Sequence, residues 1–130
     1  MNKAALNAVT ETIIGAAIEV HRELGPGLLE QSYEACLTFE LLKLGLSVER
    51  QKPLPLTYKG QRLDGGYRLD LLVEEAVVVE VKTIDRFERV HVAQMMSYLK
   101  FTDCRVGLLI NFNVALLSRG VKRVVNGFPE

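Results

Sequence analysis

Two long stretches near the start of the chain repeat apolar residues at helical spacing. From about Leu6 to Leu24 an apolar residue recurs every three or four positions, and most charged residues fall on the opposite side. A second pattern of this kind runs from about Leu28 to Leu44. Gly25 and Pro26 separate the two patterns and supply a helix stop. The chain is therefore predicted to begin with two consecutive helices.

After Gly45 the spacing of apolar residues changes from helical to strand-like. Residues 47–58 have an extended pattern that Pro53 and Pro55 interrupt. Because proline cannot donate a hydrogen bond to a strand ladder, this pattern is typical of an edge strand or a bulge. A turn is predicted at residues 59–60, where lysine is followed by glycine.

The rest of the chain alternates strands with one more helix. The remaining predicted elements are two strands, a helix and two further strands: Tyr67–Val73, Val77–Thr83, Arg86–Phe101, Cys104–Asn111 and Val121–Val125. Asp85 and Glu88 have the spacing of a capping box at the start of the third helix. The order ααβββαββ predicts a mixed β-sheet flanked by helices, in the α/β or α+β class.

Composition fits one globular domain over residues 1–130. The chain is 48% hydrophobic and 25% charged, and no run approaches the roughly 18 apolar residues of a membrane span. The N-terminus lacks the pattern of a secretory signal. Cys36 and Cys104 have no CxxC spacing and lie in apolar surroundings, so we expect reduced core thiols. A cytoplasmic protein with no membrane partner is the expectation.

Charge is distributed unevenly along a chain whose net charge is zero. Residues 1–80 carry 8 basic and 12 acidic side chains, a net charge of −4, and residues 81–130 carry 8 basic and 4 acidic side chains, a net charge of +4. This asymmetry permits a local basic face on a neutral protein. No zinc spacing, Walker A loop, GxGxxG or G-x-S-x-G motif is present.

The two strands after residue 66 each have one wholly apolar face. These faces consist of Leu69, Leu71 and Val73 in the first strand and of Val77, Val79 and Val81 in the second. Both faces must point to the core, and this requirement fixes the register. A three-residue connection at 74–76 pairs Val73 with Val77, whereas a two-residue turn would point one apolar face to the wrong side.

This register places Asp70 directly opposite Glu80, with Lys82 two residues further on the same face. Two like charges in a cross-strand pair destabilise it, and a divalent cation between them would reverse the sign of that interaction. Mg²⁺ prefers oxygen ligands and is typically held by one or two carboxylates with waters and a phosphate. Lys82 could then orient or deprotonate an attacking water, or neutralise charge in the transition state. The alternative is a solvated hairpin face on which Lys82 pairs with a carboxylate.

At this point the sequence resembles a known family. Asp70 followed by Glu80-Val81-Lys82 resembles the D…ExK core of the PD-(D/E)xK nuclease superfamily. The segment GLLEQSY, residues 27–33, matches the G-x-x-E-x-x-Y signature of the GxxExxY protein family within it. Gln94 and Tyr98 match the Q-x-x-x-Y element of the nuclease domains of some recombination exonucleases. Leu69 stands where the superfamily name has proline.

The resemblance implies a restriction-endonuclease-like fold, a Mg²⁺ or Mn²⁺ site and hydrolysis of phosphodiester bonds. It implies nucleic acid as the partner, with DNA favoured over RNA, and by analogy a possible homodimer for cutting both strands of a duplex. The alternative function is a non-catalytic nucleic-acid-binding or protein-interaction domain that retained the nuclease fold.

The resemblance also implies roles for individual residues. Asp70 and Glu80 would be metal ligands, and the backbone carbonyl of Val81 would be a third. Lys82 would position or activate the water. Glu30 would be an accessory carboxylate and possible metal ligand from the second helix, and Gln94 and Tyr98 would line the same cleft.

Glu30 also has a purely structural interpretation. If Gly27 is the N-cap of the second helix, Glu30 lies at N3, from which a carboxylate can reach back to the helix start. Glu30 nevertheless begins the stripe that continues with Tyr33, Leu37 and further leucines, which points inward. We therefore expect Glu30 to face the hairpin of Asp70 and Glu80.

Three other polar residues have ordinary interpretations beside the functional ones. Gln94 and Tyr98 are one helical turn apart and could simply mark an amphipathic boundary, whereas the resemblance favours a cleft wall that contacts phosphate or base. His21 lies on the apolar side of the first helix, which favours a hydrogen-bonded core or boundary histidine over a ligand.

Overall fold

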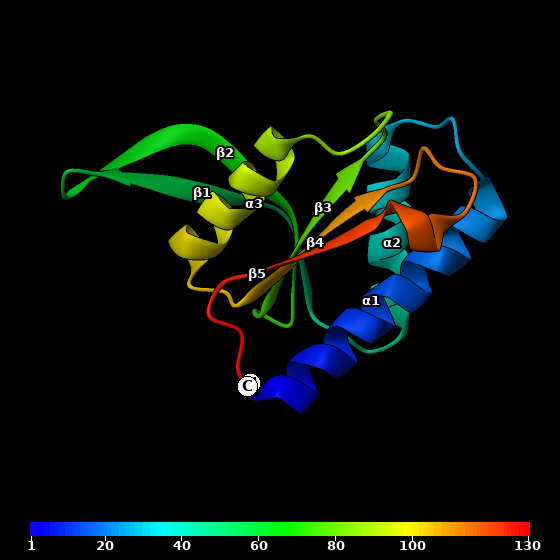
Figure 1. Ribbon diagram of the computed structural model, residues 1–130, viewed down its shortest axis with the longest axis horizontal. Helices are drawn as coiled ribbons and strands as arrows, with labels where there is room; N and C mark the ends of the chain where they lie inside the picture. The colour runs from blue at the N-terminus through cyan, green and yellow to red at the C-terminus, as the bar shows by residue number, and fades with distance from the viewer.

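The computed structural model covers residues 1–130 and contains one five-stranded mixed sheet in the order β1-β2-β3-β4-β5 (Figure 1). The elements are α1 (Lys3–Leu24), α2 (Glu30–Lys43), β1 (Val48–Tyr58), β2 (Gln61–Val73), β3 (Val77–Lys82), α3 (Arg89–Thr102), β4 (Val106–Asn111), η1 (Leu117–Gly120) and β5 (Val121–Val125). Only the β3–β4 pair is parallel, and α3 forms the crossover between these two strands. The predicted α+β architecture and the order ααβββαββ are confirmed, with the short 3₁₀ helix η1 added. No helix has both the length and the apolarity that crossing a membrane requires.

Helices α1 and α2 cover one face of the sheet, where the larger hydrophobic core lies (Figure 1). Their apolar stripes pack on the side chains of β2, β3 and β4 that point to this side. Asn2 caps α1, since its Oδ1 accepts a hydrogen bond from the amide of Ala5 at 2.9 Å. His21 is buried at the other end of α1, where its Nε2 hydrogen-bonds the Val114 carbonyl oxygen at 2.8 Å. The prediction of a hydrogen-bonded core histidine is confirmed.

Helix α3 covers the opposite face and packs there on a second, smaller core. The helix lies close to β4 because Gly107 has no side chain: a Cβ added there would meet the Met95 sulfur at 2.4 Å. Met95 is fully buried in this core, together with Leu99 of the same helix. Gly107 therefore sets the distance between α3 and the sheet. Cys104 is also buried here and Cys36 is half-buried; both are free thiols, as predicted.

The start of α3 differs from the sequence prediction. The N-cap is Glu88, and the capping box is formed with His91: the Glu88 amide donates to His91 Nδ1 at 2.8 Å, and the Glu88 side chain accepts from the His91 amide. The predicted box of Asp85 with Glu88 is wrong. Glu88 is the N-cap rather than the N3 residue, and His91 takes the N3 position. The helix therefore begins about one turn later than the apolar pattern indicated.

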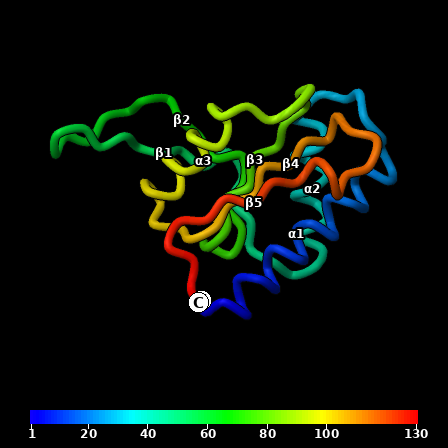
Figure 2. Tube along the Cα trace, in the orientation of Figure 1, coloured from blue at the N-terminus to red at the C-terminus, as the bar shows by residue number.

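Strands β1 and β2 continue beyond the sheet as a twisted two-stranded arm beside α3, visible in the chain trace (Figure 2). We define the arm as residues 53–68, which pair from Pro53 opposite Arg68 to the turn at residues 59–60. β1 is an edge strand, and its register shifts between Leu54 and Leu56, around Pro55. The predicted edge strand, bulge and turn are confirmed. The sequence did not predict that β2 begins as early as Gln61, because the segment up to Gly66 lacks an alternating pattern.

The β2–β3 hairpin has the predicted three-residue connection, with Val73 paired to Val77 and Leu71 to Val79. One part of the prediction is wrong. Leu71 and Val73 belong to the core under α1 and α2, but Leu69 is buried in the core under α3. The ladder between β2 and β3 has no backbone pairing beyond Leu71, and β2 changes the face it presents at Asp70. This irregular point in the strand is where the candidate chemistry lies.

Candidate active site

Asp70 and Glu80 stand where the backbone ladder between β2 and β3 ends. Each carboxylate binds the backbone of the opposite strand: the Asp70 amide donates to Glu80 Oε2 at 2.8 Å, and the Val81 amide donates to Asp70 Oδ2 at 2.8 Å. Side-chain acceptors thus replace the carbonyl acceptors of a regular antiparallel pair. The two carboxylates are brought together, as the hairpin register predicts, and they are fixed by backbone donors.

Burial and mutual repulsion make ionisation of this pair costly. Glu80 is only 4% exposed. Burial, and then the negative charge of Asp70, raise the pKa of Glu80 to about 8. Burial also raises the pKa of Asp70 to about 6, although the Val81 amide works against this rise. Ionisation of both carboxyl groups at once is therefore unfavourable in the protein alone. A bound cation would compensate the second negative charge.

Lys82 is the last residue of β3 and is half-buried beside the two carboxylates. Its positive charge lowers the pKa of both Asp70 and Glu80, but no carboxylate lies within ion-pair distance of its ammonium group. The alternative of a solvated hairpin face, with Lys82 in a salt bridge, is therefore wrong. Glu80 is buried, and the Lys82 ammonium is not engaged by a protein anion.

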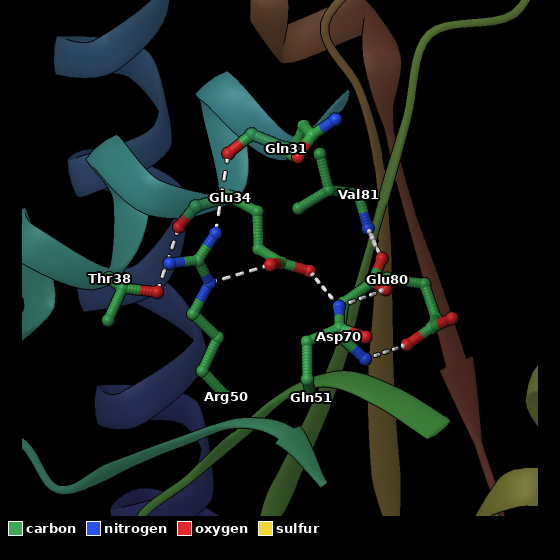
Figure 3. A network of polar contacts seen from close by, with 8 residues as sticks. All are labelled: Gln31, Glu34, Thr38, Arg50, Gln51, Asp70, Glu80 and Val81. Atoms are coloured by element: carbon green, nitrogen blue, oxygen red, sulfur yellow. Dashed lines mark hydrogen bonds and ion pairs between the residues drawn. The ribbon is translucent and has the colours of Figure 1, made fainter. Parts of the chain in front are cut away.

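A third carboxylate, Glu34, which the sequence did not single out, supports Asp70 from α2 (Figure 3). Glu34 is 5% exposed and accepts hydrogen bonds from Arg50 Nε and from Gln51 Nε2, both at 2.6 Å. The same Gln51 amide nitrogen lies 3.3 Å from Asp70 Oδ1. Gln51 thus joins the buried Glu34 to Asp70, and a bend of β1 gives it this position.

The bend in β1 is a backbone feature at Gln51 itself. Its φ is +53°, a left-handed conformation that is uncommon for residues other than glycine. Arg50 pairs with Leu71 and Lys52 with Leu69, so Gln51 lies opposite Asp70 without pairing to it. The sequence offered only a weak signal for this arrangement, a polar run between Glu49 and Pro53 in an otherwise apolar strand.

Glu30 is the first residue of α2 and points to the end of β3. Its Oε2 accepts from the Thr83 amide at 3.0 Å and lies 3.5 Å from the Thr83 hydroxyl. The helix has Leu29 as its N-cap, so Glu30 lies at N1, and the alternative in which it bonds back to Gly27 is wrong. Glu30, Glu34, Gln51 and Asp70 line one hollow of about 420 Å³, which we call the carboxylate hollow.

The glycine and tyrosine of the G-x-x-E-x-x-Y segment have structural tasks around Glu30. Gly27 has a φ of +103°, which favours glycine. Tyr33 is fully buried and stacks on Phe112 with ring centroids 4.5 Å apart. Its hydroxyl donates to the Gly25 carbonyl and accepts from the Leu28 amide at 3.1 Å. These contacts fix the loop before α2 and so the position of Glu30.

Comparison with known families accounts for this combination of residues. A sequence profile of the PD-(D/E)XK nuclease superfamily matches residues 7–124, almost the whole chain. The chain belongs to the PD-(D/E)XK nuclease superfamily. The α+β mixed sheet is consistent with the restriction-endonuclease-like fold that this family implies. Searches of curated proteins and of solved structures found no match.

Gln94 and Tyr98 line a different hollow from the acidic residues of this PD-(D/E)XK domain. They lie in a groove of about 450 Å³ between α3 and the arm, with Leu54, Tyr67 and Phe101 among the other lining residues. The structure thus divides the single cleft expected from the sequence into two hollows. The charges of the carboxylates nevertheless act on Tyr98: burial, and then the charges of Glu80 and Asp70, raise the pKa of its phenol to about 12.

The donor atoms at Asp70 and Glu80 fit a hard divalent cation of the kind that PD-(D/E)XK nucleases typically use. Both offer carboxylate oxygens, and each keeps lone pairs beyond the one backbone hydrogen bond described above. No group of three or more His, Cys, Asp or Glu side chains could hold a metal ion. The fit is therefore to an ion such as Mg²⁺, which takes its remaining ligands from water, backbone or phosphate.

Proposed function

We propose that the protein is a Mg²⁺- or Mn²⁺-dependent nuclease that hydrolyses phosphodiester bonds of DNA, with GxxExxY as its family within the superfamily. The observation that carries this proposal is the pair formed by the buried Glu80 and the half-buried Asp70, with the unpaired Lys82 beside it. A protein gains no stability from burying two adjacent carboxylates whose ionisation is opposed. A cation site for chemistry on a phosphate accounts for their position.

In the proposed mechanism the chain supplies orientation and charge. Asp70 and Glu80, with the Val81 carbonyl as a third ligand, would hold a divalent ion, which supplies Lewis-acid charge to a phosphate oxygen and a water. The Val81 and Asp70 amides keep the two carboxylates from rotating away. Lys82 holds the attacking water or balances the negative charge that develops on the phosphate. Gln51 and Glu34 position Asp70 from behind.

Three further residues have assigned places in this proposal. Glu30 is an accessory carboxylate at the rim of the carboxylate hollow. There it can bind a water or be a further ligand of the ion. Gln94 and Tyr98 contact the nucleic acid strand from the groove between α3 and the arm. These roles rest on the positions of the side chains around the pair.

The test is a cleavage assay with purified protein. Single-stranded, duplex and supercoiled DNA are incubated with Mg²⁺ or Mn²⁺, and the wild type is compared with Glu80→Ala and Lys82→Ala. We expect cleavage by the wild type and a loss of about a hundredfold or more in either variant. If the wild type cuts no substrate, or if both variants cut at the wild-type rate, the proposal is overturned.

One observation favours the rival function, a non-catalytic domain that retained the fold. Asp70 and Glu80 each accept a backbone hydrogen bond and so also fasten β2 to β3. A purely structural pair would tolerate Asp70→Asn and Glu80→Gln together, because the amides can accept the same bonds. Under the rival function this double variant binds DNA as the wild type does and neither protein cuts it; a catalytic site predicts cutting by the wild type alone.

A further inference from the structure

The groove between α3 and the arm combines an apolar lining with exposed aromatic rings. Seven of its ten lining residues are hydrophobic. Tyr67 is 45% exposed and Phe101 is 46% exposed, although both stand beside the buried Tyr98 and Leu54. Tyr67 and Tyr98 are arranged edge to face with centroids 6.3 Å apart. The rings of Tyr67 and Phe101 are thus already accessible to a ligand in the folded protein.

The two elements that form this groove, the arm and α3, carry a net positive charge in a protein of zero net charge. The arm carries three basic side chains and one acidic side chain, and α3 carries two basic and no acidic ones, a net charge of +4. The five cations are Lys59, Arg62, Arg68, Arg89 and Lys100. None of them has an ion-pair partner within the chain. The remainder of the molecule carries the compensating −4, so the positive charge is concentrated on these two elements.

The groove adjoins another hollow, which lies on the arm and is distinct from the carboxylate hollow. Two of these cations line it. Arg62 and Arg68 line this hollow of about 450 Å³, which shares Leu54, Pro55 and Tyr67 with the groove. An apolar, aromatic surface therefore passes directly into a basic one. Tyr98 also lines the groove, and it shares the core under α3 with Val78, which lies two residues before Glu80 on the same face of β3.

We infer that the groove between α3 and the arm binds an unpaired strand of DNA and directs its phosphate backbone toward Asp70 and Glu80. Unpaired bases expose their faces and stack on aromatic rings, while cations along the rim follow the phosphates. A duplex hides its base faces and would gain little from an apolar groove. The polar lining consists of Gln94, Ser97 and the two tyrosine hydroxyls, which are too few to specify a sequence. Single-stranded DNA is therefore the proposed substrate class. That the strand is directed toward Asp70 and Glu80 rests on the proposed function.

Binding is measured separately from cutting, so that the inference and the proposed function can fail independently. A fluorescent oligodeoxythymidine of roughly 12 nucleotides is titrated with the full chain in EDTA, and its anisotropy is recorded. A duplex and an RNA of the same length are the comparison probes. We expect the single-stranded DNA to bind at least about tenfold more tightly than the duplex, with an affinity that falls as salt rises.

Two variants and a matched control locate the site. Tyr67→Ala and Phe101→Ala should each weaken binding of the oligonucleotide by about tenfold. Phe39→Ala removes a ring that is 64% exposed on α2, on the opposite side of the sheet, and should leave binding within about twofold of wild type. Circular dichroism of all three variants verifies folding, which should be retained because every ring removed is exposed.

The possible results divide as follows. Tight single-strand binding that Tyr67→Ala and Phe101→Ala weaken supports the inference even if no DNA is cut. Tighter binding of duplex or RNA, or equal affinities of the groove variants and Phe39→Ala, overturns it even if DNA is cut. A stable dimer that Phe101→Ala dissociates would also overturn it, because a second copy would then occupy the groove.

Discussion

The carboxylate hollow and the groove are built in opposite ways. In the hollow, Glu34, Gln51 and Asp70 are fixed to one another or to the backbone by hydrogen bonds, and Asp70 is tied in this way to β3 beside Glu80. In the groove, Tyr67 and Phe101 are half-exposed, and the surrounding cations have no partner in the chain. One site is rigid before any ligand arrives, whereas the other leaves its side chains free to adapt.

This difference suits two successive tasks. Chemistry on a phosphate requires charges that are already in place when the substrate arrives, because reorganisation in the transition state costs rate. Holding a flexible strand of any sequence requires surface that tolerates many poses. Tyr98 of the groove lies in the same core as Val78, and Glu80 follows Val78 on the same face of β3. A strand held in the groove can therefore reach the carboxylates.

The largest expected effect is on activity at the rigid site. Asp70→Asn keeps an oxygen that can accept from the Val81 amide but removes a charge from the proposed ion site. DNA cleavage should fall by about a thousandfold, while the free energy of unfolding stays equal or rises. Asp103→Asn is the control, because asparagine tolerates the left-handed conformation of this helix cap. Activity retained in Asp70→Asn would contradict the assignment.

The next effect is the pH dependence of stability without metal. The folded pKa of Glu80, about 8, lies above its ordinary value of 4.5, so the folded state binds the extra proton between these values. Stability should therefore be greatest at low pH in this window and should fall by roughly 3 kcal/mol as pH rises from about 5 to about 8. Urea unfolding in EDTA measures this change.

Glu80→Gln provides the control for the pH effect, since it has no carboxyl to titrate and should flatten most of the slope. Saturating Mg²⁺ should also oppose the loss, because a bound cation favours the ionised form. Stability that rises with pH across this range in the wild type would contradict the described environment of Glu80.

A third prediction compares the two hollows directly through stability. Glu34→Ala leaves Arg50 and Gln51 without their acceptor and should lower the free energy of unfolding by about 2 kcal/mol. Phe101→Ala in the groove should lower it by less than about 1 kcal/mol, because the ring is half-exposed. Glu40→Ala, on the same helix as Glu34 but without an ion pair, is the control. Equal losses in the two hollows would remove the distinction between them.

The smallest expected effect is on stability and concerns the packing of α3, one wall of the groove, on β4. Gly107→Ala forces Met95 to move and should lower the free energy of unfolding by about 1.5 kcal/mol. Gly15→Ala meets nothing within 4 Å in the middle of α1 and should raise it by about 0.5 to 1 kcal/mol. Thermal unfolding distinguishes the two. A neutral Gly107→Ala would mean that α3 is not seated closely on β4.

The sequence predicted what depends on local patterns. The apolar face formed by positions 77, 79 and 81 and the three-residue connection to β2 were enough to place Asp70 opposite Glu80, because only one register buries both apolar faces. The helix stop at Gly25 and the prolines of β1 were recognisable because they too are local signals. Glu30 was correctly expected to turn toward the hairpin because its stripe points inward.

The residues that the sequence missed depend on non-local partners. Glu34 is one glutamate among several on an amphipathic helix, and only the fold shows that Arg50 and Gln51 meet it. By sequence, Leu69 follows the alternation of its strand. The side-chain hydrogen bonds at Asp70 end the ladder, however, and Leu69 is buried in the core under α3 instead of the core under α1 and α2. The arm lacks a strand pattern because it is exposed on both faces, so no periodicity marks it.

The claim that Asp70 and Glu80 form a cation site is tested most directly by Mn²⁺ binding. Free Mn²⁺ is measured by electron paramagnetic resonance while the full chain is titrated near pH 8, in parallel with folded Glu80→Gln. The account predicts that the wild type depletes the free-ion signal, that depletion weakens toward pH 5 as the pair takes up protons, and that Glu80→Gln largely abolishes it. Equal depletion by both proteins, or none by the wild type, would contradict the account.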